Sequence, residues 1–184
     1  MNIQPKRILW PTDFSDLSLG AVGFVRQYHR SFGAQVHVIH VCVPLPDPAS
    51  LPVGVTLSPS QKGILNSFLD AARRRLKALV DDRLQDISPI VSKVLSGHAW
   101  PEICAYAGRT HADLIIVATH GLTGLRHAFL GSTAERIVQH APCPVLTVKA
   151  FSQSRKVARR KAFGARPARQ RRRATGRAAP GPAS

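Results

Sequence analysis

Cysteine is scarce in this 184-residue chain, and no two cysteines lie close together in the sequence. Cys42, Cys104 and Cys143 are unevenly spaced and form no CxxC pair. Structural zinc sites and disulfide frameworks rely on closely paired or numerous cysteines. The spacing therefore argues against a metal site and indicates small core residues in a reducing compartment.

Long apolar runs are also missing from the sequence. No segment approaches the roughly 20 apolar residues that a membrane-spanning helix needs. The first residues, MNIQPKRILWPTDF, do not have the pattern of a signal peptide. We therefore expect a cytoplasmic protein without a membrane partner.

Acidic residues are absent from one long segment, 151–184. This segment has 11 of the 26 lysines and arginines and none of the ten acidic residues, so residues 1–150 carry 15 basic and 10 acidic residues. Its larger apolar residues are too sparse to build a core. The sequence predicts a mildly basic folded domain over 1–150 and a basic, disordered C-terminal tail over 151–184.

The tail contains two dense clusters of positive charge, residues 159–161 and 171–173. Such clusters bind polyanions by releasing condensed counterions. No pattern of aromatic residues accompanies them, so any binding of nucleic acid would be non-specific. A solubilising extension without a partner is the alternative interpretation.

Five short apolar runs alternate with segments of helical periodicity in the rest of the chain. The expected strands cover residues 7–10, 36–43, 90–95, 114–118 and 144–148. Four helices are expected between them, because parallel strands need helical crossovers. The pattern predicts an α/β fold: a three-layer, doubly wound, parallel five-stranded sheet of Rossmann-like type.

The first two of these helices show apolar faces with three-to-four spacing. The first begins at Ser15 or Asp16, ends at Gly33, and has its apolar face at Leu17, Ala21, Phe24, Val25 and Tyr28. The second has a stripe of Leu65, Phe68, Leu69, Ala72, Leu76, Leu79 and Val80. Five prolines between Pro44 and Pro59 predict a loop before it.

The segment from Asp113 to Lys149 carries the clearest functional signal. A buried strand leads into a loop with several glycines, and a helix begins at Ser132, where Ser132 and Glu135 have the spacing of a capping box. Glycine before a helix N-terminus lets the backbone approach a ligand, and free N–H groups there attract an anion. This combination points to phosphate and therefore to a nucleotide.

Three segments of the sequence resemble the universal stress protein family, over roughly residues 5–149. They are ILWPTDFS, HVIHV and ATHGLTGLRHAFLGSTAERIVQHAPCPVLTVK. The ATP-binding branch of that family carries a G-x2-G-x9-G-S/T pattern, and the matching positions are Ala118, Gly121, Gly131 and Ser132. Alanine replaces the first glycine, which puts the affinity in question more than the binding mode.

The resemblance implies a strand order of 3-2-1-4-5 and a site for ATP, with Mg²⁺ bridging its phosphates. Asp13 and the main chain of Val41 would hold the adenosine, and the backbone at Ala118 would lie along the ribose. The implied nucleotide-binding set is Pro11, Thr12, Asp13, Val41, Val117, Ala118, Gly121, Gly131, Ser132 and Thr133, of which the last four cradle the phosphates. It also implies a homodimer through the last strand, Pro144, Val145, Leu146, Thr147 and Val148.

The predicted function is that of a non-catalytic stress-response regulator that binds an adenine nucleotide. The alternatives are a weak ATP hydrolase and a polyanion-binding protein acting through its tail. No G-x4-G-K-[ST] motif supplies the lysine that phosphoryl transfer commonly uses, which disfavours the enzyme. Simpler interpretations also exist for single residues: Asp13 as a turn brace, Ser132 as a plain N-cap, and His37, His40 and His140 as structural.

Overall fold

The computed structural model describes residues 4–43, 58–119 and 130–149. Its elements follow one another as β1 (Arg7–Pro11), α1 (Asp16–Leu19), α2 (Val22–Phe32), β2 (Gln35–Cys42), α3 (Pro59–Arg83), β3 (Ile90–Ser96), α4 (Ala99–Arg109), β4 (Leu114–Ala118), α5 (Ser132–His140) and β5 (Val145–Val148). Residues 44–57 of the predicted proline-rich loop and the whole predicted tail lie outside the described residues.

The strands form one parallel sheet in the order β3-β2-β1-β4-β5, which confirms the predicted fold class and strand order. Strand β1 is central and pairs with β2 on one side and β4 on the other; Leu9, for example, lies opposite both His37 and Ile115. The strand order therefore reverses at β1. In sheets of this kind, ligands bind beyond the carboxyl ends of the strands at such a point.

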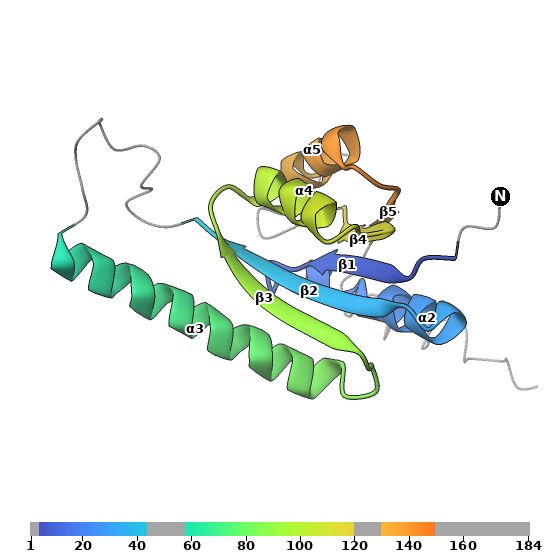
Figure 1. Cartoon of the computed structure of the whole chain (residues 1–184), viewed down its shortest axis with the longest axis horizontal. Helices are drawn as coiled ribbons and strands as arrows, with labels where there is room; N and C mark the ends of the chain where they lie inside the picture. Colours follow the sequence, from blue (N-terminus) through green and yellow to red (C-terminus); the bar gives the residue numbers. More distant parts are fainter. Residues whose placement is uncertain (1–3, 44–57, 120–129, 150–184) are drawn as a thin grey trace, which may run out of the picture. The chain divides into compact units, whose positions relative to one another are not determined.

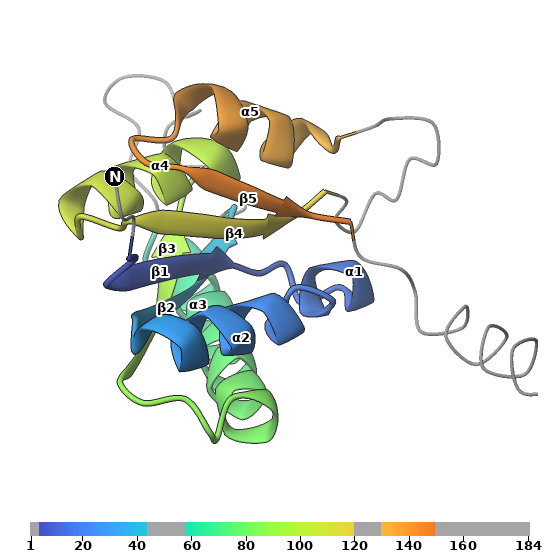
Figure 2. The same cartoon turned by 90° about the vertical axis from the view of Figure 1, so that its right-hand side faces the viewer.

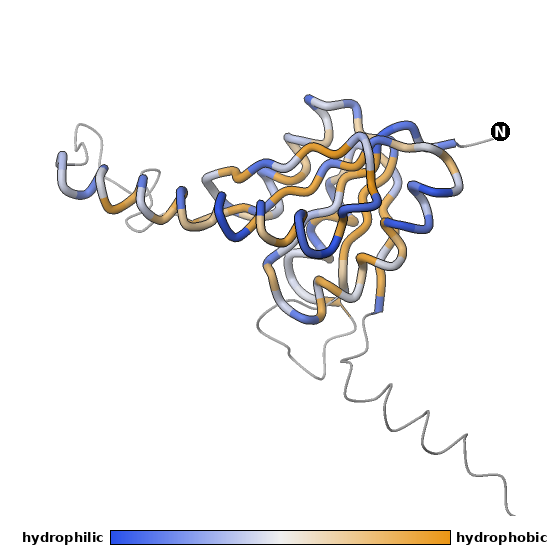
Figure 3. The backbone as a smooth tube through the Cα atoms, turned by 90° about the horizontal axis from the view of Figure 1, so that it is seen from below, coloured by the Kyte–Doolittle hydropathy of each residue, from blue (hydrophilic) through white to orange (hydrophobic). Residues whose placement is uncertain are grey.

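Helices cover both faces of the sheet and give the three layers (Figures 1 and 2). Helices α2 and α3 lie on one face, and α4 and α5 lie on the other. Each face has its own apolar cluster, and successive residues of β1 alternate between them: Ile8 and Trp10 belong to the first, and Leu9 belongs to the second. The central strands are buried on both faces, which is why they read as unbroken apolar runs. Figure 3 shows these strands as the most hydrophobic part of the chain.

The segment predicted as one helix before Gly33 is two helices in the structure. A tight turn at Gly20, a poor helix former, separates them. The Gly20 N–H donates to the carbonyl of Leu17, and the Ala21 N–H donates to the carbonyl of Ser18. Helix α2 buries Val22 and Val25, whereas Phe24, which was predicted on the apolar face, is 43% exposed. Gly33 ends α2 in a left-handed conformation, φ 64°, as expected.

Helix α3 begins earlier than its apolar stripe suggested. Ser58 and Gln61 form a capping box that sequence reasoning missed, with Pro59 in the first turn. Leu76 is 2% exposed, whereas Phe68, a predicted member of the same stripe, is 63% exposed. The reason is geometric: the N-terminal half of α3 extends beyond the sheet, so that half has no sheet to pack against (Figure 1).

Within residues 4–43, 58–119 and 130–149, no helix combines the length and the apolar character that crossing a membrane requires.

Candidate functional site

A cavity of about 280 Å³ lies at the carboxyl end of the sheet; we call it the central cavity. It brings together the ends of β1, β2 and β4 and the first turns of α4 and α5. Nine of the ten predicted site residues line it, namely Pro11, Thr12, Asp13, Val41, Val117, Ala118, Gly131, Ser132 and Thr133. The tenth, Gly121, lies outside the described residues. The structure thus brings these nine residues together around one cavity. Their role in binding a ligand stays a prediction.

The turn after β1 is held by a set of short hydrogen bonds that fix Asp13. Ser15 donates to Asp13 Oδ1 from both its backbone nitrogen, at 3.0 Å, and its hydroxyl, at 2.6 Å. Phe14 N–H donates to Thr12 Oγ1 at 3.1 Å, and Phe14 itself has a positive φ of 63°. Asp13 therefore braces the turn and lines the cavity at the same time, so the two interpretations from the sequence are compatible.

The start of α5 differs from the predicted capping box. The N-cap is Gly131 in an extended conformation, no side chain caps this end, and Ser132 is the first helical residue. Ser132 is displaced from the cap because Gly131 N–H donates to the Thr119 carbonyl at 2.6 Å and Gly131 accepts the first helical bond from Glu135. Ser132 and Thr133 are exposed, and their N–H groups belong to the first turn, whose donors have no acceptor within the helix.

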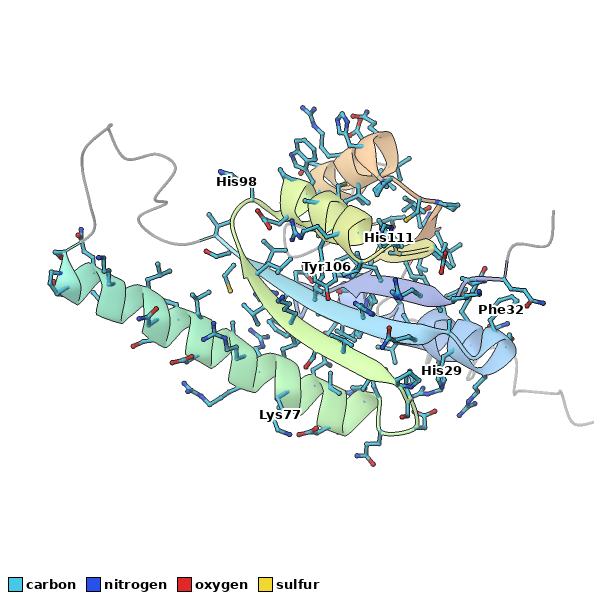
Figure 4. All side chains as sticks on the ribbon, in the orientation of Figure 1. His29, Phe32, Lys77, His98, Tyr106 and His111 are labelled. Atoms are coloured by element: carbon cyan, nitrogen blue, oxygen red, sulfur yellow. The ribbon has the colours of Figure 1, made fainter. Side chains whose placement is uncertain are left out.

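The structure adds several lining residues that sequence reasoning did not select. Ala99 and Ile103 of α4 reach the cavity, as do Ser18, His40 and Thr119. The α4 residues follow the carboxyl end of β3, so the rule that identified Asp13 and Val41 also applies to them. Figure 4 shows His98 on the segment that leads from β3 into α4, directly before Ala99.

His40 is the least expected of these residues, because it was interpreted as structural. Its Nδ1 lies 2.8 Å from the carbonyl oxygen of Thr12, which can only accept, so Nδ1 carries the hydrogen. Burial lowers the pKa of His40; the hydrogen bond to Thr12 and the charge of Asp13 oppose this effect, and the charge of Arg75 adds to it. A neutral His40 at pH 7 keeps Nε2 as an acceptor.

The lining has the chemistry of a site for a small, partly apolar ligand with an anionic end. Val41, Ile103, Val117 and Ile137 supply apolar surface, while polar groups gather at the turn after β1 and at the start of α5. Such a mixture of mostly apolar walls and a few convergent polar groups is typical of cofactor sites. Among the described residues, no group of three or more His, Cys, Asp or Glu could hold a metal ion.

The chain is similar in sequence to known proteins. The model of the universal stress protein family matches residues 5–149. Universal stress protein MJ0531 of Methanocaldococcus jannaschii is 35% identical over 144 residues, which cover 78% of this chain and 82% of the relative.

Two solved structures share the fold. That of protein MJ0577, also from Methanocaldococcus jannaschii, has a TM-score of 0.66 at 25% identity and covers 79% of this chain and 96% of its own. A universal stress protein family protein from Arabidopsis thaliana, solved with AMP bound, has a TM-score of 0.53 at 20% identity and covers 81% and 94%.

Proposed function

This chain belongs to the universal stress protein family, and on that premise we propose that it is a non-catalytic stress-response regulator that binds an adenine nucleotide in the central cavity. ATP is the proposed ligand, with ADP and AMP as its close relatives. We also propose a cytoplasmic location, in keeping with three cysteines that are all free thiols.

One observation carries this proposal: Asp13, Val41 and the first turn of α5 line the same cavity. These residues come from three segments of the chain and meet because β1 lies between β2 and β4. A carboxylate accepts hydrogen bonds from ribose hydroxyls, a strand-end backbone pairs with an adenine edge, and a helix N-terminus binds phosphate. The cavity therefore offers one group for each part of an adenylate.

Each lining residue has a proposed place along the nucleotide. Asp13 and the Val41 main chain hold the adenosine, and the backbone at Ala118 follows the ribose. Gly131, Ser132 and Thr133 surround the phosphates, since Gly131 has no side chain to block their approach to the N–H groups of α5. Pro11, Thr12 and Val117 complete the walls.

The relatives support the ligand class. The Arabidopsis thaliana protein, which shares the fold, was solved with AMP bound. Magnesium would accompany ATP through the phosphates, because Mg²⁺ keeps several waters and needs only one or two carboxylates from a protein. Asp13, the carboxylate among the described residues that line the cavity, is assigned to the adenosine, so the described lining offers no further carboxylate to the ion.

A binding role rather than turnover is favoured by the charges of the cavity. Its described lining contains Asp13 and His40 as ionisable residues and no lysine or arginine to neutralise a transferred phosphoryl group. Weak ATP hydrolysis is the alternative. Polyanion binding by the tail stays a separate prediction from its charge.

Isothermal titration calorimetry with ATP, ADP and AMP, with GTP as a control for the base, tests the proposal. We expect adenine nucleotides to bind and Asp13→Asn to weaken them on the order of tenfold, because a charge-assisted hydrogen bond is lost. Single-turnover measurements of ATP on the same protein address the alternative. Rapid, magnesium-dependent loss of ATP would favour an enzyme.

We further propose a two-fold homodimer through β5. Among the described strands β5 is an edge strand that pairs with β4, and Thr147 on it is exposed. An apolar edge of this kind invites pairing with a second copy of the chain.

A further inference from the structure

A second cavity, of about 440 Å³, lies between the end of β2 and the N-terminal half of α3. We call it the α3 cavity. Of the described residues, three line both this cavity and the central cavity: Asp13, His40 and Val41. Its volume falls in the range of about 300–1,000 Å³ that is usual for small-molecule sites. The proposed nucleotide site does not use it.

The walls of the α3 cavity are largely apolar and aromatic. Phe68, Leu65 and Leu69 line it from α3, and Phe14 lines it from the turn after β1. Phe68 is 63% exposed although it is a large apolar residue. Figure 3 shows apolar turns alternating with hydrophilic ones on the part of α3 that extends beyond the sheet. These walls suit a flat, apolar group.

Arg75 is the cation in the described lining of this cavity. The guanidinium of Arg75 lies 4.4 Å from the centroid of the Phe14 ring. Of its neighbours on α3, Arg73 pairs with Asp70 and Lys77 pairs with Asp81, both at 2.6 Å, whereas Arg74 forms no ion pair among the described residues. In the described part of the chain, Arg75 itself forms no ion pair.

The surroundings of Arg75 favour an anion over a cation as its partner. Asp13 is the carboxylate that reaches the described lining, and it lies on the border with the central cavity, where the Ser15 hydroxyl donates to it. His40 also lies on that border; burial lowers its pKa, and the charge of Arg75 lowers it further. Arg75 is therefore the charged side chain on the α3 side of the described lining, while Asp13 lies on the border with the central cavity.

We propose that the α3 cavity is a second ligand site, which takes a small organic monoanion with an aromatic body. The ring packs against Phe68 and Leu69, and the anionic group pairs with the guanidinium of Arg75, which offers a planar set of donors. Because Asp13, His40 and Val41 belong to both cavities, a ligand in one changes the affinity of the other; this coupling rests on the proposed nucleotide function.

The site itself can be tested without any nucleotide. The probe is 8-anilinonaphthalene-1-sulfonate, an aromatic monoanion whose fluorescence rises on binding, titrated into the full chain at fixed ionic strength. We expect Arg75→Met, which keeps an apolar stem and removes the charge, to weaken binding on the order of tenfold. The matched control is Arg74→Met, which removes the same charge from the adjacent position outside the cavity lining.

The uncharged analogue N-phenyl-1-naphthylamine separates charge from shape. Its affinity should be equal in the parent protein and in Arg75→Met. Ala72→Phe, which places a ring inside the cavity, should weaken both probes. Gly131→Val alters only the central cavity and should leave both unchanged, so failure of the nucleotide proposal would not affect this result.

Three outcomes would overturn the second site: equal losses of the sulfonate in Arg74→Met and Arg75→Met, no loss in either, or loss in Gly131→Val. The first would assign the binding to general surface charge. The last would place the probe in the central cavity.

Discussion

His37 on β2 and Tyr106 on α4 share a hydrogen bond inside the sheet–helix layer, with 3.0 Å between His37 Nδ1 and the tyrosine oxygen. The other ring nitrogen, Nε2, lies 3.1 Å from Gln35 Oε1. Both rings are buried, and Figure 4 shows Tyr106 on α4 above the sheet. Both nitrogens of His37 are thus engaged where water has little access.

We expect His37 to make the stability of the fold depend on pH. Burial lowers the pKa of His37, and the charge of Arg7 lowers it further. The unfolded chain therefore binds more protons than the folded one as the pH falls below the ordinary histidine pKa of about 6.5. We expect the free energy of unfolding to be greatest above that pH and to fall below it, until the folded-state pKa is passed.

Urea unfolding between neutral and mildly acidic pH measures this effect. His37→Gln keeps hydrogen-bonding groups and cannot titrate, so the slope of stability against pH should be smaller in the variant. The other histidines contribute equally to both proteins. Equal slopes would show that His37 is not a titrating group in this range.

The start of α5 gives a second prediction, because Ser132 does not cap that helix. Ser132→Ala should change the free energy of unfolding little, since the side chain makes no cap bond there. Ser15→Ala is the matched comparison: Ser15 Oγ accepts from Ser18 N–H at 3.1 Å and caps α1, so its loss should cost about 1 kcal/mol. Chemical denaturation measures the free energy of unfolding of both variants. A larger loss of stability in Ser132→Ala than in Ser15→Ala would show that Ser132 caps α5 after all.

Local sequence patterns predicted the sheet because its strands are short and its central strands are buried on both faces. β4 begins at Leu114 and ends at Ala118, as predicted, and the site residues follow from the rule that parallel strands end at the same edge. The errors have tertiary causes. Periodicity placed Phe24 and Phe68 on apolar faces, but α2 buries Val22 and Val25 in place of Phe24, and the N-terminal half of α3 extends past the sheet.

The site was less predictable where contacts between segments that are distant in the sequence determine the position of a residue. Nothing local shows that His40 binds the Thr12 carbonyl, because the two residues meet only when β1 and β2 pair. Similarly, the Gly131 N–H is taken by Thr119, which moves the cap by one residue from its sequence signature. The spacing of residues can be read from the sequence, whereas these hydrogen-bond partners are known only from the fold.

The proposed dimer is tested by a charge on the edge strand. Thr147→Asp should weaken or abolish the dimer, because two copies related by a two-fold axis would bring like charges together across β5. Sedimentation velocity of the variant and of Gln139→Asp, which adds the same charge on the exposed surface of α5, measures the oligomeric state. An unchanged dimer in Thr147→Asp would rule out β5 as the interface.

The central claim is that the backbone around Gly131 binds the phosphates of an adenine nucleotide, and Gly131→Val tests it most directly. Gly131 has φ −70° and ψ 149°, which valine adopts without backbone strain, and we expect the new side chain to block the approach of the phosphates. Gly23→Val is the matched control, since a Cβ at Gly23 meets nothing within 4 Å. Calorimetric titration with ATP should show binding in the parent protein and in Gly23→Val and its loss in Gly131→Val. Undiminished ATP binding in Gly131→Val would contradict the account.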